Sequence, residues 1–524
     1  MKRILAFLLV AAAITTAQTP AAGPRKPKLI LAIVIDQFRY DYLTRYRREY
    51  TGAFTRLLSR GAVFTNANYE HAPTATACGH SLFLSGAFPN VSGIIGNEWF
   101  DWEAHKLITS VTDDSVKLLG GSLDPPASPR RLLVTTIGDE LKIANGEKSR
   151  VIGVSLKDRA AILPPGRMAD GAFWIEARTG SVVSSTFYFP DLPQWVKDLN
   201  RSKPADQYSG ADWIGHKMLK VGEANYYSSL QYTPFGNELV ELLAERALTA
   251  EKMGRHEATD LLTVSFSSTD YVGHTYGPDS PEALDTALRA DKLLDKFFRA
   301  VDAQVGLANT LIVLTADHGA ASLPEVSAAR KLGGGRLPPP EMQSAVEAKL
   351  NERFGKEKWI LGAAGAIDPR FHEFLTFYLD RDLIRQKNID AALFERVAAE
   401  AARAIPHIAS VYTRGQLMAG FQMGDMVGRR VQNGYNFVRG GDLLLIPEPN
   451  WMFSLSGTTH GTPYGYDTHV PIVFMGTGIK PGKYNRAVAP NDIAPTLATM
   501  LEIEIPSGSS GRVLEEMLSP TAGQ

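Results

Sequence analysis

Four long apolar runs constrain the fold of this chain more than any other feature of its sequence. Each has the length of a strand and lacks helical periodicity: LILAIVID (29–36), LLTVSFSSTD (261–270), TLIVLTADHG (310–319) and VPIVFMG (470–476). Continuous apolar runs are expected for strands buried on both faces of a largely parallel sheet. Amphipathic segments at 43–61 and 282–301 lie between them. The sequence therefore predicts an α/β fold in which helices sandwich a mostly parallel central sheet.

Two regions interrupt this alternation. Residues 160–235 contain a hairpin-like stretch, GAFWIEARTGSVVSSTFYF, with Thr179-Gly180 at its turn. Residues 325–440 begin with the loop KLGGGRLPPPEM and continue with helix and strand patterns of their own. We interpret both regions as caps inserted into a single catalytic α/β domain that spans residues 26–524.

The first residues have the features of an export signal. Lys2 and Arg3 precede a short apolar run that ends in small residues, so we predict a signal peptide over 1–17 and a mature chain that begins at Gln18. No apolar run approaches the roughly 20 residues that a membrane-spanning helix needs. The expected location is periplasmic or secreted. Cys78 is the only cysteine, so the exported chain folds without an internal disulfide.

The charge of the chain is nearly balanced. Its 524 residues carry a formal charge of −1, which becomes −3 when Lys2 and Arg3 are lost with the signal peptide. This balance does not indicate a nucleic acid or an anionic membrane as a partner. Hydrophobic residues make up 44% of the chain, which is enough for a large core. The sequence does not indicate an oligomeric state.

Acidic side chains stand at the ends of three predicted strands. The first run ends at Asp36, the second at Asp270, and the third at Asp317 and its neighbour His318. An aspartate in this position is often only a turn or helix-cap residue. Ligands of α/β proteins, however, bind beyond the carboxyl ends of the strands. Three aspartates that meet at one edge of the sheet therefore predict a binding site.

Histidines accompany the aspartates. His274 follows Asp270 in STDYVGHTYG, and His460 precedes the last run in SGTTHGTPYGYDTHVPIVF. With His318 there are three imidazoles and three carboxylates, a set that suits two zinc ions because zinc binds both ligand types. The spacing of Asp270 and His274 places both on one side of a helical turn. Two divalent ions would make the cluster positive and attract an anionic phosphate.

Other residues compete for these assignments. His469 is the alternative to His460, which we prefer because it lies in a glycine-rich loop. His71 and His80 are interpreted as structural histidines. Asp467 is interpreted as a turn residue or as a residue that supports the metal ligands.

The stretch HAPTATACGH (71–80) begins a predicted helix of about ten residues that Gly86 ends. A threonine at such a start is usually an N-cap. The same helix start directs backbone N–H groups toward an anion, and a hydroxyl beside zinc can attack phosphorus. The two interpretations are compatible, and Thr76 fits them better than Thr74 because it lies at the turn itself. Cys78 is interpreted as a packed thiol.

Lys157 and Arg159 follow the apolar run VIGVSL, two residues apart, so on a strand they would project from the same side. The simplest interpretation is an exposed strand face. Beside a metal cluster they would instead contact the non-bridging oxygens of a phosphoryl group. A monoester offers these oxygens unsubstituted, whereas a diester does not, so the pair favours monoesters. Asn97, after Gly96, is either a turn residue or an amide donor to the same group.

These residues resemble the alkaline phosphatase superfamily, and more closely its phosphate-irrepressible (PafA-like) phosphatases, which use a threonine nucleophile. The resemblance runs from about Ile30 to the C-terminus through IVIDQFRYDYL, PTATACGH, GIIGNEW, SLKDRAAI, STDYVGHTYGP, TADHG and THGTPYGYDTHVP. It implies that Thr76 is the nucleophile and that the phosphoryl group is contacted by Asn97, Lys157 and Arg159. It also implies one zinc site formed by Asp270, His274 and His460, and another formed by Asp36, Asp317, His318 and the Thr76 oxygen.

The expected function is therefore zinc-dependent hydrolysis of small-molecule phosphate monoesters through a phosphothreonine intermediate. The main alternative is a phosphodiesterase or nucleotide pyrophosphatase on the same scaffold. A sulfatase is disfavoured because the C-x-P-x-R pattern does not follow Cys78. A zinc- or phosphate-binding protein without turnover would lack at least one of the chemical residues, and none is missing.

Overall fold

A ten-stranded sheet forms the centre of the protein in a computed structural model that describes residues 26–365, 372–420 and 424–519. The predicted signal peptide, residues 1–17, lies outside the described residues. From one edge to the other, the strands are β20 (Gly482–Tyr484), β2 (Ala62–Phe64), β19 (Ile472–Gly476), β12 (Thr310–Thr315), β1 (Leu29–Ile35), β11 (Asp260–Phe266), β6 (Val151–Ser155), β7 (Gly171–Ile175), β8 (Val182–Ser185) and β5 (Leu118–Leu119).

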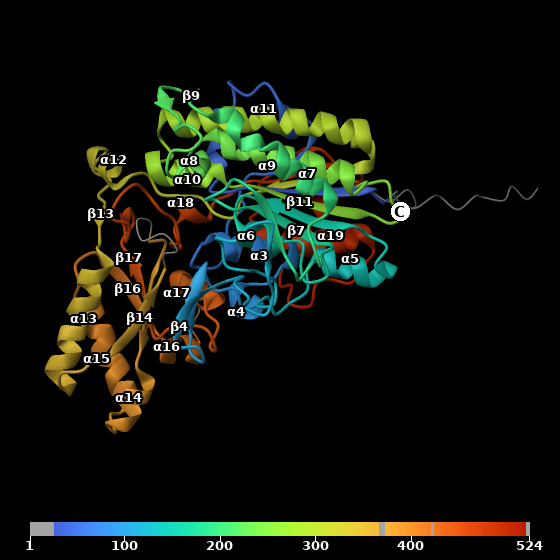
Figure 1. The fold of residues 1–524 in the computed structure, drawn as a ribbon. Coiled ribbons are helices and arrows are strands. Elements are labelled where there is room, and N and C mark those ends of the chain that lie inside the picture. Colours follow the sequence, from blue (N-terminus) through green and yellow to red (C-terminus); the bar gives the residue numbers. More distant parts are fainter. Residues whose placement is uncertain (1–25, 366–371, 421–423, 520–524) are drawn as a thin grey trace, which may run out of the picture.

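The strands at the middle of the sheet, from β12 through β1, β11 and β6 to β7, all run parallel. Helices cover both faces (Figure 1), so the predicted α/β fold with a mostly parallel central sheet is confirmed. Strand β19 runs antiparallel to β12, which the apolar pattern of this segment did not indicate. Its beginning therefore lies at the edge where the parallel strands end, and so does the segment that precedes it.

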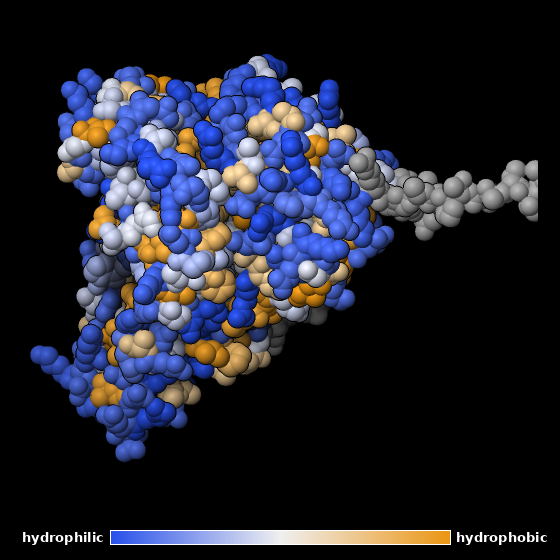
Figure 2. All heavy atoms as spheres, turned by 45° about the vertical axis from the view of Figure 1, so that its right-hand side comes forward, coloured by the Kyte–Doolittle hydropathy of each residue, from blue (hydrophilic) through white to orange (hydrophobic). Residues whose placement is uncertain are grey.

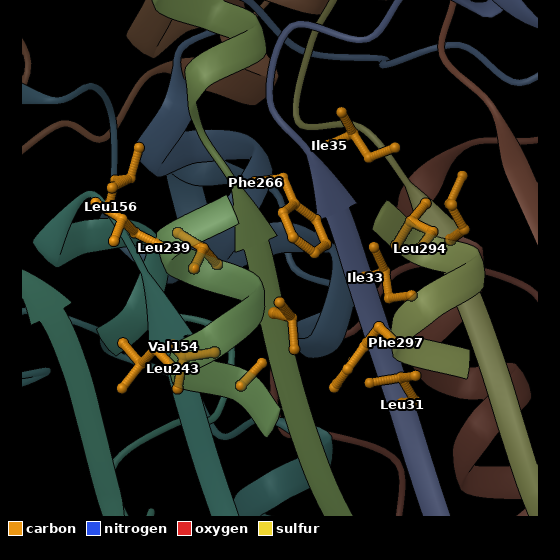
Figure 3. Close-up of a cluster of buried hydrophobic side chains, with 14 of the residues drawn as sticks. Leu31, Ile33, Ile35, Val154, Leu156, Leu239, Leu243, Phe266, Leu294 and Phe297 are labelled. Atoms are coloured by element: carbon orange, nitrogen blue, oxygen red, sulfur yellow. The ribbon is translucent and has the colours of Figure 1, made fainter. Parts of the chain in front are cut away.

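Strand β1 shows why these runs are continuously apolar. Its side chains alternate between the two faces of the sheet. Leu31, Ile33 and Ile35 belong to one core (Figure 3), whereas Ile30 and Val34 belong to the core on the opposite face. The first core includes side chains of α2 (Ala53–Arg60), α9 (Pro234–Ala250) and α11 (Pro281–Gln304), and the second those of α3 (Thr76–Ser85), α5 (Ile137–Asn145) and α19 (Ile493–Leu501). Both faces of β1 are therefore buried.

The helix predicted over 282–301 is α11, but the single helix predicted over 43–61 is wrong, because α1 (Tyr40–Arg45) and α2 share this segment. The buried carboxylate of Asp291, on α11, determines where α2 begins. It accepts hydrogen bonds of 2.9, 2.7 and 2.7 Å from the backbone N–H groups of Thr51, Gly52 and Phe54. No local side chain caps α2, so its first N–H groups depend on this distant residue.

The predicted hairpin is present, since β7 and β8 pair in antiparallel fashion and Gly180 has a φ of 68° at the turn. Its place in the fold differs from the expectation, however. Strand β7 pairs with β6, so the hairpin extends the central sheet. This part of residues 160–235 therefore belongs to the core of the fold rather than to a cap.

The region predicted as a second insertion, residues 325–440, forms a lobe beside the central sheet (Figure 1). It has an antiparallel sheet of its own, in the order β14 (Ile360–Ala364), β15 (Leu375–Leu379), β17 (Leu443–Pro447) and β16 (Ile408–Thr413). Two helices, α13 (Pro339–Phe354) and α15 (Ala391–Arg403), pack on this sheet around a separate hydrophobic cluster. Because β17 belongs to it, the lobe extends past the predicted boundary at residue 440.

One face of the molecule is mainly hydrophilic, with hydrophobic residues in scattered spots (Figure 2). Within residues 26–365, 372–420 and 424–519, no helix combines the length and the apolar character that crossing a membrane requires.

We expect Asp291→Ala to lower the free energy of unfolding by about 3 kcal/mol, because three backbone N–H groups lose their acceptor. Urea unfolding followed by circular dichroism measures the loss. Asp302→Ala is the matched control, since the carboxylate of Asp302 accepts one N–H group at an exposed position on the same helix. A similar loss in both variants would contradict the capping role of Asp291.

Candidate active site

Two groups of acidic and imidazole side chains lie together at the carboxyl edge of the central sheet. One consists of Asp270, His274 and His460, and the other of Asp36, Asp317 and His318. In each group, one ligand atom from every residue lies within 4.8 Å of the others. All six side chains are buried. The structure thus brings together the residues that the sequence assigned to two metal ions, with the same division between them.

The sheet delivers these residues in different ways. Asp36 directly follows β1, and Asp317 comes shortly after the end of β12. The strand predicted to reach Asp270 ends at Phe266, and Asp270 lies in the first turn of α10 (Ser268–Tyr276). His274 is one turn further along this helix, with its Nε2 3.1 Å from Oδ1 of Asp270. The predicted helical spacing of this pair is therefore present.

His460 reaches the site from the segment before β19, which lies at this edge because β19 is antiparallel. Its ring stacks on that of His318 at a centroid distance of 3.5 Å and lies 5.1 Å from that of His274. It therefore lies between the histidines of the two groups.

Each of these three imidazoles uses its Nδ1 atom for a backbone carbonyl. The acceptors are Thr458 for His274, Thr74 for His460 and Gly319 for His318, at 2.7, 2.7 and 2.9 Å. Because a carbonyl only accepts, Nδ1 carries the proton and Nε2 keeps its lone pair for a metal. Burial and the neighbouring His318 and His274 lower the pKa of His460 well below its usual value, which keeps this imidazole neutral.

The unsatisfied atoms of the site fit divalent cations. Oδ1 of Asp36, Oδ2 of Asp317 and Nε2 of His460 have no hydrogen-bond partner among the described residues. Buried polar atoms normally have one. Burial, together with the charge of Asp317, raises the pKa of Asp36 well above its usual value, because two buried carboxylates repel each other. A bound cation removes that repulsion, and carboxylate and imidazole donors suit zinc.

Lys157 connects the two groups. Its Nζ lies 2.6 Å from Oδ2 of Asp36 and 2.6 Å from Oδ2 of Asp270, so it contacts one carboxylate of each group. Burial alone would lower the pKa of this ammonium group, but the carboxylates of Asp270 and Asp36 raise it. Lys157 therefore stays charged between the two candidate metal positions.

Thr76 is the first residue of α3, which has the predicted ten residues and ends at Gly86 with a φ of 67°. The N-cap position belongs to Ala75, and no side chain caps the helix, so the N-cap interpretation of Thr76 is wrong. Its hydroxyl is left for the site, where Oγ1 lies 3.5 Å from Nε2 of His318. Cys78 is a buried thiol that contacts the carbonyl of Ile94, as expected for a packed residue.

Arg159 and Asn97 lie close to the two groups. Lys157 and Arg159 do not share a strand as predicted, because β6 ends at Ser155 and Arg159 lies on α6 (Asp158–Ile162). Nε of Arg159 is buried and has no hydrogen-bond partner among the described residues. Oδ1 of Asn97 accepts a hydrogen bond of 2.9 Å from the N–H group of Ala77, at the start of α3. This bond fixes the amide of Asn97 beside the Thr76 helix.

Two residues of the site were missed by the sequence analysis. Gln37 donates through its backbone N–H to Oδ1 of Asp317, at 3.1 Å, and through Nε2 to Oδ1 of Asp270, at 2.6 Å, so it holds both groups. Only its position next to Asp36 pointed to it. Glu373 accepts two contacts from the Asn97 amide, and no motif surrounds it. Burial, partly offset by Arg159, raises the pKa of Glu373 to about 7.

The competing residues lie elsewhere or support the ligands. Nε2 of His469 contacts the carbonyl of Thr65, and its ring stacks on Tyr40, outside both groups. His80 hydrogen-bonds to the carbonyl of Thr76 through Nδ1 and to the hydroxyl of Ser265 through Nε2, so both of its nitrogens are occupied. His71 is buried against Tyr69, and Asp467 accepts hydrogen bonds from Thr462.

This arrangement brings a hydroxyl, two candidate cation positions, a lysine and an arginine close together. Such a set can bind a tetrahedral anion and stabilise charge on its oxygens. The family model for type I phosphodiesterase / nucleotide pyrophosphatase matches residues 30–469. The chain belongs to this family, and thereby to the alkaline phosphatase superfamily that its motifs resemble.

Within this phosphodiesterase and nucleotide pyrophosphatase family, the chain is similar to proteins described as alkaline phosphatases. It is 35% identical to alkaline phosphatase PafA of Elizabethkingia meningoseptica over 99% of each chain. It is 37% identical to alkaline phosphatase PhoV of Synechococcus elongatus over 94% of this chain and 93% of the relative. The crystal structure of wild-type PafA matches with a TM-score of 0.85 at 34% identity, over 94% of this chain and 99% of that one.

We expect His460→Asn to lower the metal content of the purified protein by about one ion per chain, because one of the two candidate metal groups loses a donor. His469→Asn is the matched control and should keep both ions, since Nε2 of His469 contacts a carbonyl. Elemental analysis by mass spectrometry distinguishes the two variants. Loss of metal from the His469 variant alone would reverse the assignment.

Proposed function

We propose that this protein is an exported alkaline phosphatase that hydrolyses phosphate monoesters with two zinc ions and a phosphothreonine intermediate. The observation that carries the proposal is the position of the Thr76 hydroxyl beside His318, a member of one of two groups of three metal donors each. The similarity to alkaline phosphatases over nearly the whole chain supports the same activity. The predicted signal peptide over 1–17 is the basis for export.

The proposed ligands divide as the structure groups them. Asp270, His274 and His460 would hold one zinc ion, and Asp36, Asp317, His318 and the Thr76 oxygen would hold the other. Bound zinc ions supply Lewis-acid stabilisation of the attacking and departing oxygens. Gln37 orients a carboxylate of each group, and the Nδ1 bonds of the imidazoles fix the direction of their Nε2 atoms.

In the proposed reaction, Oγ1 of Thr76 loses its proton to hydroxide and attacks phosphorus. The bond between phosphorus and the ester oxygen breaks, and the alkoxide departs with the bonding electrons and takes a proton from water to become the alcohol. Water then cleaves the phosphothreonine, which releases phosphate and restores the hydroxyl. Because Thr76 is the first residue of α3, the positive end of the helix dipole favours the anion throughout.

The preference for monoesters rests on Asn97, Lys157 and Arg159. A monoester dianion leaves three oxygens for these donors, and their two positive charges match its charge. A solved variant of PafA carries substitutions of a threonine, an asparagine, a lysine and an arginine together. The spacing of the first two equals that of Thr76 and Asn97, and the spacing of the last two equals that of Lys157 and Arg159. This agreement supports the assignment of the corresponding roles to Thr76, Asn97, Lys157 and Arg159 of this chain.

The proposed reaction is tested with an aryl phosphate and a bis-aryl phosphate. We expect the wild-type protein to prefer the aryl phosphate, and a chelator to abolish the activity until zinc is restored. Lys157→Ala and Arg159→Ala should each lower kcat/KM for the monoester by about 100-fold or more, and for the diester far less, because the diester has fewer free charged oxygens. A wild-type preference for the diester would make the protein a phosphodiesterase instead.

The nucleophile is tested separately. Thr76→Ala should abolish monoester turnover, by a factor of about 1,000 or more, whereas Thr74→Ala should retain the reaction. Thr74 is the matched control because its hydroxyl is engaged with the carbonyl of Thr462 and the N–H group of Gly461. Rapid acid quenching followed by mass spectrometry should find phosphate on Thr76 in the wild type. Full activity of the Thr76 variant would exclude the phosphothreonine pathway.

A further inference from the structure

Glu373 brings a carboxylate from the inserted lobe against Asn97, one of the three proposed phosphoryl contacts. It lies shortly before β15, the strand that begins at Leu375 in the sheet of the lobe. Its side chain is buried at 9% exposure, although the residue belongs to a region far in sequence from every motif of the site. The lobe therefore contributes a charged group to the site as well as a surrounding wall.

Both oxygens of this carboxylate face the Asn97 amide. Nδ2 of Asn97 lies 2.6 Å from Oε1 and 2.7 Å from Oε2 of Glu373. The opposite end of the same amide, Oδ1, accepts from the N–H group of Ala77, so the amide has one orientation. A phosphoryl oxygen that binds Nδ2 must share this nitrogen with the carboxylate.

The backbone around Glu373 is wedged between two loops of the site. On one side the ring of Phe374 lies against Gly96, where an added Cβ would come 2.9 Å from its Cζ atom. On the other side an added Cβ at Gly461, beside His460, would come 2.0 Å from the carbonyl oxygen of Glu373. The segment therefore packs directly against both loops, and this packing positions the carboxylate.

The charge of this group opposes the rest of the pocket. Lys157 and Arg159 attract a phosphoryl dianion, whereas an ionised Glu373 repels it. Glu373 is buried and the side chain of Arg159 is 14% exposed, and the charge of Arg159 partly offsets the effect of burial on the pKa of Glu373. In alkaline solution the carboxylate is ionised, so a bound dianion meets a like charge beside its Asn97 donor.

We propose that Glu373 is a specificity-determining residue that weakens the binding of phosphoryl dianions, the product phosphate included. This inference rests on the proposed phosphatase function. It gives the inserted lobe a defined chemical role: through one carboxylate, the lobe sets how tightly the pocket holds a doubly charged anion relative to a singly charged one.

The test compares Glu373→Gln with the wild type in alkaline buffer, with zinc present. Glutamine keeps the size and an acceptor oxygen but removes the charge. The inhibition constant of inorganic phosphate in the aryl phosphate assay should fall about tenfold, and KM for the aryl phosphate should fall with it. KM for the singly charged bis-aryl phosphate should change much less. Glu341→Gln, an exposed position on α13 of the same lobe, is the matched control and should leave all these values unchanged.

A second variant separates charge from shape. Glu373→Asp keeps the negative charge and should retain an inhibition constant close to that of the wild type. Unchanged phosphate inhibition in Glu373→Gln would overturn the proposal. Weaker phosphate binding together with a lower kcat in that variant would also overturn it, because Glu373 would then act by positioning Asn97. Calorimetric titration of the zinc-loaded protein with inorganic phosphate measures binding without turnover, so it tests the proposal even if the wild type hydrolyses no monoester.

Discussion

The structure of the site depends on the repulsion among three buried carboxylates at one sheet edge. Asp36, Asp270 and Asp317 lie within two adjoining groups from which water is excluded. Buried like charges are costly unless cations compensate them. Lys157 supplies one positive charge to both groups, and the lone pairs of three imidazoles point to where further cations would bind. The three aspartates therefore need more positive charge than Lys157 supplies, and bound cations would provide the remainder.

Close backbone packing fixes these groups in place. Gly79 lets α3 lie directly on the segment of Asp317, because an added Cβ there would come 2.3 Å from its carbonyl oxygen. Gln37 spans the two groups by its backbone and its side chain. The catalytic threonine proposed here thus sits on a helix that touches the metal-binding edge, and its position follows from the packing of two backbones.

The candidate metal ligands and the carboxylate that we propose to weaken anion binding come from different parts of the chain. The candidate metal ligands come from the central sheet and its connections, whereas Glu373 comes from the lobe. Asn97 is the point of contact, since its amide touches both the start of α3 and the carboxylate of the lobe.

The sequence by itself determined the fold class, the six candidate metal ligands and the helix that begins at Thr76. Buried strands read as unbroken apolar runs, and residues at their ends must meet at one edge. It did not determine the direction of β19 or the start of α2, because each depends on a partner far along the chain. The contact of Glu373 with Asn97 joins residues from the lobe and the core, and only the packing of the one against the other decided it.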